Sequence, residues 1–314
     1  MRHHSLSSLL ITIFLLAGSY VSAQNTRPYE QMLDQARIEK IVTYLADDMT
    51  RGRASGTPGK QYAEQYIVNA FREAGLTPVN WNYTQSFRHD DTTVLRNVVG
   101  LIPSAFESDE YIVISAHYDH MGEMGGKIFS GADDNASGVA ALISMAELFA
   151  KMKRDGKGPR KNLIFVAFDG KELSMAGSRY FVRHLPVPKS KILCNVNMDM
   201  LGTDLVPTGK NKEYLILLGE ERLPESCRGY ASYLSRRVQY RMDLDLTFYG
   251  SRDFTRMVLD MSDQKSFAKA GIPAVCFTSA FHQHTYKPTD RPDIINFPLL
   301  KKRIMLIFNF INHL

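Results

Sequence analysis

The stretch Gly131-Ala132-Asp133-Asp134-Asn135-Ala136-Ser137-Gly138 leads directly into an apolar segment at 139–149. Glycines at both ends permit backbone conformations that other residues rarely adopt, and Asn135 or Ser137 can cap a helix that begins there. The two aspartates predict a loop that holds a positive charge. An acidic helix start, favoured by the helix dipole alone, is the alternative interpretation. The segments on either side decide between the two.

Three apolar segments near this loop have the length and β-branched content of buried strands, at 111–116, 162–168 and 193–198. They end respectively in His117-Tyr118-Asp119-His120, in Asp169-Gly170-Lys171-Glu172 and in Asp199. Because ligands of α/β proteins typically lie at strand ends, we expect these polar groups at one edge of a sheet. Imidazole and carboxylate groups without a thiolate suit a hard or borderline divalent cation.

Strand patterns alternate with helical patterns over most of the chain. Further strands are predicted at 81–88, 94–102, 214–218 and 274–278, and helices at 30–49, 60–74, 226–238 and 299–311. This alternation predicts an α/β fold of three layers, αβα, with a mixed, mainly parallel central sheet that helices cover on both faces.

The N-terminus has the pattern of a secretory signal peptide. Arg2 precedes a short apolar segment at 9–17, and Val21-Ser22-Ala23 forms a small-residue cleavage site before Gln24. The apolar segment is too short to span a bilayer comfortably, although an uncleaved anchor is the alternative. We therefore expect residues 1–23 to be removed on export to the periplasm or the medium, which leaves no membrane span. Residues 24–314 suffice for a single large domain.

Charge and cysteine content exclude some classes. The 38 Lys and Arg against 33 Asp and Glu give a net charge of +5, which falls to +4 without Arg2. The densest basic segment, 151–161, is typical of a solvated helix end, so we expect no nucleic-acid partner. Of the three cysteines, Cys194 and Cys276 lie in strand-like segments, which favours buried free thiols over a disulfide framework.

Several short motifs, taken in order, resemble the zinc exopeptidases related to bacterial leucyl aminopeptidase, a group that also contains glutaminyl cyclases and glutamate carboxypeptidase. The matching motifs are Ala116-His117-Tyr118-Asp119, residues 131–138, Glu172 with Ala176-Gly177-Ser178, Asn197-Met198-Asp199-Met200-Leu201-Gly202, Ser262-Asp263, Gly271-Ile272-Pro273 and Lys287-Pro288-Thr289-Asp290. The resemblance implies the aminopeptidase-like fold and one zinc-exopeptidase-like domain over 24–314.

The same resemblance implies a role for each matching residue. His117 and Asp199 hold one zinc, and Asp134, rather than Asp133, bridges it to a second zinc bound by Glu172. Asp119 orients the His117 ring as an outer partner of the metal. The peptide bond after Asp134 is expected to be cis.

The residue before Glu172 departs from the family pattern. The family has a glutamate there as general base, whereas this chain has Lys171. A lysine can act as a base only if its pKa is strongly lowered, and the sequence leaves the direction of the shift open.

Two further departures concern the C-terminal half. Tyr286 stands where the family has its last metal-binding histidine, although His284 or His282 could reach the site. Gln264 replaces a histidine on the substrate side, where we also place Tyr286 as a substrate-binding residue. These changes predict one zinc rather than two, with the Lys171 ammonium paired to Glu172 or Asp134 in place of the second ion.

The implied activity is that of an exported metallo-aminopeptidase, which removes N-terminal residues from a peptide with a metal-activated water. Two alternatives stay open. The chain is either a catalytically impaired family member that binds a peptide or a single metal, or a glutaminyl cyclase.

Overall fold

The computed structural model describes residues 26–79 and 81–314, so the predicted signal peptide lies outside the described residues. The strands are β1 Thr77–Pro78, β2 Thr84–Arg88, β3 Val94–Ile102, β4 Tyr111–His117, β5 Gly122–Met124, β6 Lys127–Phe129, β7 Asn162–Phe168, β8 Ile192–Met198, β9 Tyr214–Leu218, β10 Asp243–Asp245 and β11 Ala274–Thr278. The α-helices are α2 Arg27–Met32, α3 Gln35–Leu45, α4 Pro58–Ala74, α5 Gly138–Arg154, α6 Ala176–Arg183, α7 Tyr230–Ser235, α8 Arg252–Leu259, α9 Gln264–Lys269 and α10 Phe297–His313.

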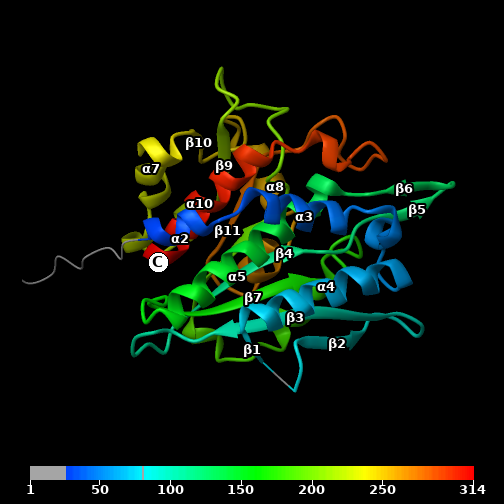
Figure 1. Ribbon diagram of the computed structural model, residues 1–314, viewed down its shortest axis with the longest axis horizontal. Helices are drawn as coiled ribbons and strands as arrows, with labels where there is room; N and C mark the ends of the chain where they lie inside the picture. The colour runs from blue at the N-terminus through cyan, green and yellow to red at the C-terminus, as the bar shows by residue number, and fades with distance from the viewer. Residues whose placement is uncertain (1–25, 80) are drawn as a thin grey trace, which may run out of the picture.

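Nine of the described strands form one sheet in the order β1-β3-β7-β4-β8-β11-β9-β10, with β2 beside β3 (Figure 1). The central neighbours β7, β4, β8 and β11 are parallel. Strand β3 is antiparallel to β7, and β9 is antiparallel to β11. The predicted mixed sheet with a parallel centre is therefore confirmed. Strands β5 and β6 form a separate hairpin.

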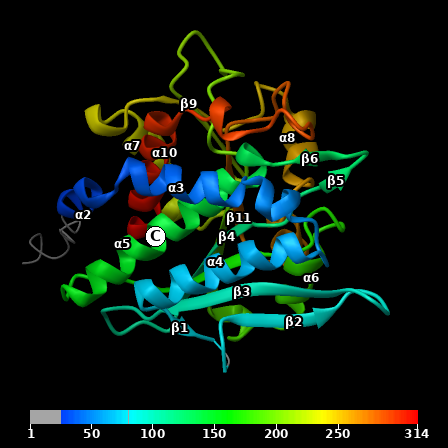
Figure 2. The ribbon, with the colours of Figure 1, turned by 45° about the vertical axis from the view of Figure 1, so that its right-hand side comes forward.

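Helices cover both faces of this sheet, as predicted. Side chains of β4 alternate between the faces: Ile112 and Ile114 pack with α3, α4, α5 and α10, whereas Val113 packs with Phe181 of α6 and Phe267 of α9. Figure 1 and Figure 2 show α3, α5 and α4 side by side over one face. The result is a three-layer αβα sandwich.

Helix boundaries differ from the prediction in two places. The predicted helix at 30–49 is broken, because Asp34 is extended and its side chain accepts the Ala36 N–H at 3.0 Å, which caps a new helix. In the predicted helix at 226–238, only Tyr230–Ser235 is α-helical. The segment begins after Gly229 in the left-handed conformation and is followed by a short 3₁₀ turn at Val238–Tyr240.

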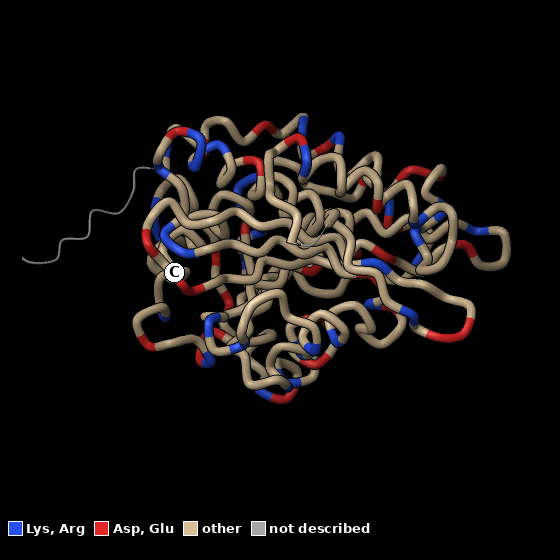
Figure 3. The backbone as a smooth tube through the Cα atoms, turned by 90° about the horizontal axis from the view of Figure 1, so that it is seen from below, with Lys and Arg blue, Asp and Glu red and all other residues tan. Residues whose placement is uncertain are grey.

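All three cysteines are buried and free, as expected. Lys and Arg are interspersed with Asp and Glu around the molecule (Figure 3). Within residues 26–79 and 81–314, no helix combines the length and the apolar character needed to cross a membrane.

Candidate metal centre

The carboxyl ends of the central parallel strands bring the predicted site residues together. His117 is the last residue of β4, and Asp199 directly follows β8. Lys171 and Glu172 lie in the turn after β7, and Asp134 lies in the turn before α5. This is the edge of an open α/β sheet at which ligands usually bind.

The aspartate loop is fixed by hydrogen bonds from outside it. The Asp290 carboxylate accepts the backbone N–H groups of Asp133 and Asp134 at 2.8 and 3.0 Å. The Asn135 side chain accepts the N–H of Gly138, the first residue of α5, at 3.1 Å. The peptide bond between Asp134 and Asn135 is cis, as the resemblance implied. The two hydrogen bonds to Asp290 therefore limit movement of Asp134 away from the strand ends.

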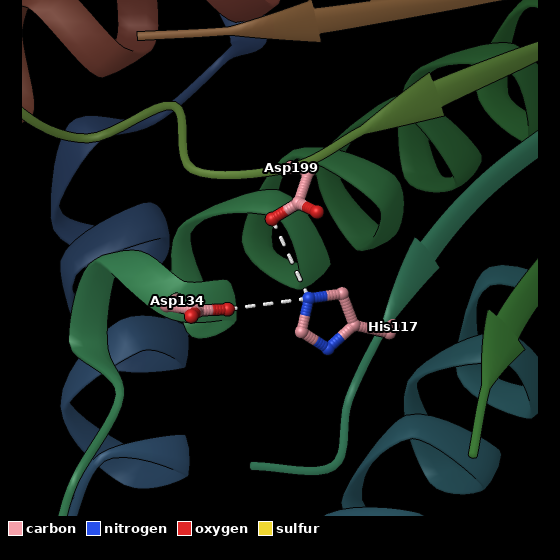
Figure 4. Close-up of side chains that lie close together, drawn as sticks. All are labelled: His117, Asp134 and Asp199. Carbon is pink, nitrogen blue, oxygen red and sulfur yellow. Dashed lines mark ion pairs between the residues drawn. The ribbon is translucent and has the colours of Figure 1, made fainter. Parts of the chain in front are cut away.

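His117, Asp134 and Asp199 form the first group of potential ligands. The His117 Nε2 atom lies 3.3 Å from Asp134 Oδ1 and 3.4 Å from Asp199 Oδ1 (Figure 4). All three atoms are buried and have no hydrogen-bond partner among the described residues. Buried polar atoms normally have a partner, and one imidazole with two carboxylates is a suitable donor set for zinc. The first group therefore fits a zinc ion.

Asp119 contacts the His117 ring, as predicted, but through its backbone carbonyl rather than through its carboxylate. Its backbone carbonyl lies 3.1 Å from His117 Nδ1, whereas its carboxylate is 3.8 Å away. The carboxylate instead accepts the backbone N–H groups of Lys171 and Glu172 at 3.0 and 3.1 Å. The carbonyl thus orients the His117 ring, and the carboxylate positions the turn that carries Lys171 and Glu172. Burial raises the pKa of Asp119 to about 7.

His120, Asp134 and Glu172 form a second group, in which the potential ligand atoms lie within 4.8 Å of one another. The Lys171 ammonium lies among these carboxylates. Its Nζ atom is 2.9 Å from Glu172 Oε1 and 3.6 Å from Asp134 Oδ1. It is also 3.3 Å from the Tyr286 hydroxyl. A positive charge is therefore already present beside Glu172 of the second group, and it also lies 3.6 Å from the Asp134 oxygen that belongs to the first group.

The surrounding charges decide the protonation of Lys171. Burial lowers its pKa, but the carboxylates of Asp134, Asp199 and Glu172 outweigh burial and raise the pKa well above its ordinary value. Burial raises the pKa of Asp134, but Lys171 and the nearby imidazoles hold it well below the ordinary value. In the metal-free protein, Lys171 is thus held as an ammonium at neutral pH and does not act as a base.

Of the C-terminal candidates, Tyr286 contacts the site, whereas His284 and His282 lie around it. Tyr286 reaches the site through Lys171, and burial raises its pKa to about 12. His284 belongs to neither group of potential ligands, since its Nδ1 atom pairs with Thr289 Oγ1 at 2.9 Å. His282 pairs with Asp133, with Nε2 3.0 Å from Oδ2, and so supports the aspartate loop.

The prediction that Gln264 binds substrate is wrong. Its side chain is fully buried and accepts a hydrogen bond from Asn197 at 2.9 Å. It also donates to the Leu259 carbonyl at 3.0 Å. These bonds hold α9 against β8, and the amide is committed to them.

His120 is the functional candidate that the sequence prediction missed. It is next to Asp119 in the motif, so the signal was present. Because β4 ends at His117, however, the alternation of side chains along a strand no longer applies three residues later. The chain turns there, and the His120 ring comes to lie beside Asp134, with Nδ1 3.9 Å from Oδ2.

Fold and site together define an α/β protein of the metallohydrolase class. The model of Peptidase family M28 matches residues 97–311, and the chain belongs to that family. A probable zinc metalloprotease of Pyrenophora tritici-repentis is 23% identical over 202 residues, which cover 59% of this chain and 44% of that protein. This chain spans about half or less of the first curated relatives that it matches.

Solved structures share the whole fold at low sequence identity. The LapA aminopeptidase of Legionella pneumophila is 17% identical, with a TM-score of 0.72 over 94% of this chain and 75% of that one. A glutaminyl cyclase of Porphyromonas gingivalis is 18% identical, with a TM-score of 0.65 over 88% of this chain and 97% of that one. Because both peptidase and cyclase chains have this fold, the fold alone does not decide between the two reactions.

Proposed function

We propose that the protein is an exported metallo-exopeptidase of the aminopeptidase type, with a single zinc held by His117, Asp134 and Asp199 and with slow turnover. The observation that carries the proposal is the contrast at the site. The ligand atoms of the first group are buried and have no hydrogen-bond partner among the described residues, whereas Glu172 of the second group is paired with the Lys171 ammonium at 2.9 Å, which also lies 3.6 Å from the shared Asp134. Membership of Peptidase family M28 supports a hydrolase.

The second ion is opposed by electrostatics. At a separation of roughly 5 Å and an effective dielectric near 20, an ammonium raises the energy of a divalent cation by about 6 to 7 kcal/mol. This energy corresponds to several decades of affinity. Tyr286 also provides no imidazole at the position where the family has one.

Each site residue then has a defined task in hydrolysis. Zinc, when bound, polarises a carbonyl group and makes water a better nucleophile. The Lys171 ammonium and the Tyr286 hydroxyl are donors that can stabilise negative charge on the carbonyl oxygen in the transition state. Glu172, whose side chain is 26% exposed, is available to bind the N-terminal ammonium of a peptide. No carboxylate stands at the family's base position to accept the proton of the attacking water, which is the reason for slow turnover.

Kinetics on aminoacyl chromogenic substrates test this proposal. We expect the natural protein to turn over far more slowly than the roughly 10 per second of an ordinary enzyme. Combining Lys171→Glu with Tyr286→His restores the family's base and ligand, and it should raise both turnover and zinc content. Lys287→Glu makes the same charge change at an exposed lysine nearby and should change neither. Two tightly bound zincs with ordinary turnover in the natural protein would contradict the proposal.

A catalytically impaired family member that binds a peptide or one metal is the second candidate, because Lys171 is an ammonium at the base position. Binding of zinc and peptide without turnover, even in the double variant, would identify this role. Formation of a cyclised product from peptides with N-terminal glutamine would instead identify a glutaminyl cyclase.

Export is tested separately. Mass spectrometry of the protein from its native host should find an N-terminus at or near Gln24. An intact Met1 in the cytosolic fraction would refute export.

A further inference from the structure

We infer that the second group, His120, Asp134 and Glu172, is a latent site for a divalent cation, in which His120 supplies the imidazole and Lys171 keeps the cation out. The inference deepens the proposed function, and it rests on that proposal for the first zinc only. It assigns the second ion's imidazole ligand to His120, in place of the histidine that is absent at Tyr286.

The His120 imidazole is buried and unsatisfied. Its side chain is 1% exposed, and neither ring nitrogen has a hydrogen-bond partner among the described residues. Buried ring nitrogens in this state normally have a partner. The nearest acidic atom is Asp134 Oδ2, 3.9 Å from His120 Nδ1, and it also lacks a hydrogen-bond partner. At 3.9 Å the two groups are too far apart for a direct hydrogen bond.

Asp134 can serve two cations because its two oxygens face different imidazoles. Oδ1 lies beside His117, and Oδ2 lies beside His120. The carboxylate therefore offers one oxygen to the first group and the other to the second. A carboxylate has lone pairs enough on both oxygens for this.

The backbone holds the His120 ring in place. Gly131 is in the left-handed region with φ of +58°, and a Cβ atom added there would lie 2.6 Å from His120 Cδ2. The ring thus packs directly on the Gly131 backbone, at the start of the loop that carries Asp134. The His120 N–H donates to the Arg53 carbonyl at 3.2 Å, which fixes the main chain as well.

The donor set indicates the class of ion. One imidazole with two carboxylates suits zinc or a similar borderline divalent metal. Lys171 meets the same electrostatic need, because its Nζ atom is close to both Glu172 and Asp134. Removing the ammonium deprives Glu172 of its ion pair at 2.9 Å and leaves Asp134 Oδ2 facing the His120 imidazole.

Zinc titration of metal-free protein tests the assignment by calorimetry or equilibrium dialysis. The natural protein should bind one zinc tightly, and Lys171→Met should bind two. Adding His120→Ala to Lys171→Met should lower the affinity for the second zinc by more than about 10-fold. Loss of even an outer partner of a metal ligand lowers the affinity by about 10- to 100-fold. Adding His284→Ala to the same background is the matched control, and it should leave both zincs unchanged.

The titration separates this inference from the proposed function. Retention of the first zinc in the His120 variant shows that the protein is folded, and His120→Gln replaces His120→Ala if the smaller side chain prevents folding. An unchanged second zinc without His120, or only one zinc in Lys171→Met, overturns the inference and leaves the proposed function intact. Absence of a first zinc in the natural protein overturns the proposed function itself.

Discussion

The two groups of potential ligands share Asp134 and lie at the same sheet edge, yet they meet the charge of their carboxylates differently. In the first group, the buried ligand atoms of His117, Asp134 and Asp199 face one another and have no hydrogen-bond partner in the part of the chain that the structure describes, with the Lys171 ammonium no nearer than 3.6 Å to Asp134. In the second, an ammonium from the chain itself lies 2.9 Å from Glu172. In the proposed site, a side chain thus replaces a metal ion as the counter-charge of a carboxylate cluster, and the base that catalysis needs is lost.

Removing the imidazole of the first group should have the largest effect. His117→Ala deletes the only nitrogen ligand of that group, so we expect zinc affinity to fall by more than about 100-fold, beyond the effect of losing an outer partner. Competition with a chromophoric chelator measures the change. His284→Ala removes a histidine outside both groups and should not alter the affinity. Equal effects of the two substitutions would show that the first group is not the zinc site.

The next prediction compares two buried lysines. Lys171→Met removes the counter-charge of the second group, and Lys60→Met removes the partner of buried Asp169, 2.8 Å from Lys60 Nζ. Each should lower the free energy of unfolding of the metal-free protein by about 3 to 5 kcal/mol, the usual cost of breaking a buried pair.

Zinc at the first group should stabilise both variants, but Lys171→Met should recover more stability than Lys60→Met, because a second cation can replace the missing ammonium there. Urea denaturation with zinc and with chelator measures both variants. Equal recovery of stability by zinc in the two variants, or no recovery in either, would contradict the role of Lys171 as a substitute for an ion.

A smaller effect concerns pH. Burial lowers the pKa of His117, but Asp199 and Asp134 outweigh it, and the pKa lies well above the ordinary 6.5. Folded, metal-free protein therefore keeps a proton that the unfolded chain loses as pH rises above 6.5, so stability falls over that window. The His117 proton alone changes the free energy of unfolding by at most about 1.4 kcal/mol per pH unit.

Zinc competes with the same proton, so zinc affinity should rise with pH over this window. His117→Gln should reduce the change in metal-free stability above pH 7, where Asp119 and Asp290, each with a pKa of about 7, and His282, whose pKa Asp133 raises against burial, contribute the rest. A slope that survives this substitution unchanged would assign the proton to another group. Urea denaturation at a series of pH values provides the measurement.

Much of the fold could be predicted from the sequence, because strands buried on both faces appear as continuous apolar segments. The predicted strands at 162–168, 214–218 and 274–278 coincide with β7, β9 and β11. The break between α2 and α3 was missed, because a single capping aspartate, Asp34, interrupts an otherwise helical pattern.

The candidate site was predictable where residues are tied to strand ends, as for His117 and Asp199. It was not predictable where the chain turns. The position of the His120 ring and the hydrogen bonds of the Asp119 carboxylate both depend on the loop geometry beyond β4. The protonation of Lys171 depends on its distances to Asp134 and Glu172, which no sequence pattern contains.

The zinc content of the natural protein, purified without chelator, shows whether one ion or two occupy the metal centre. Elemental analysis beside an accurate protein concentration should give one zinc per chain, and the same preparation of His117→Ala should give none. Two tightly bound zincs in the natural protein would contradict the account, because Lys171 would then not stand in for the second ion.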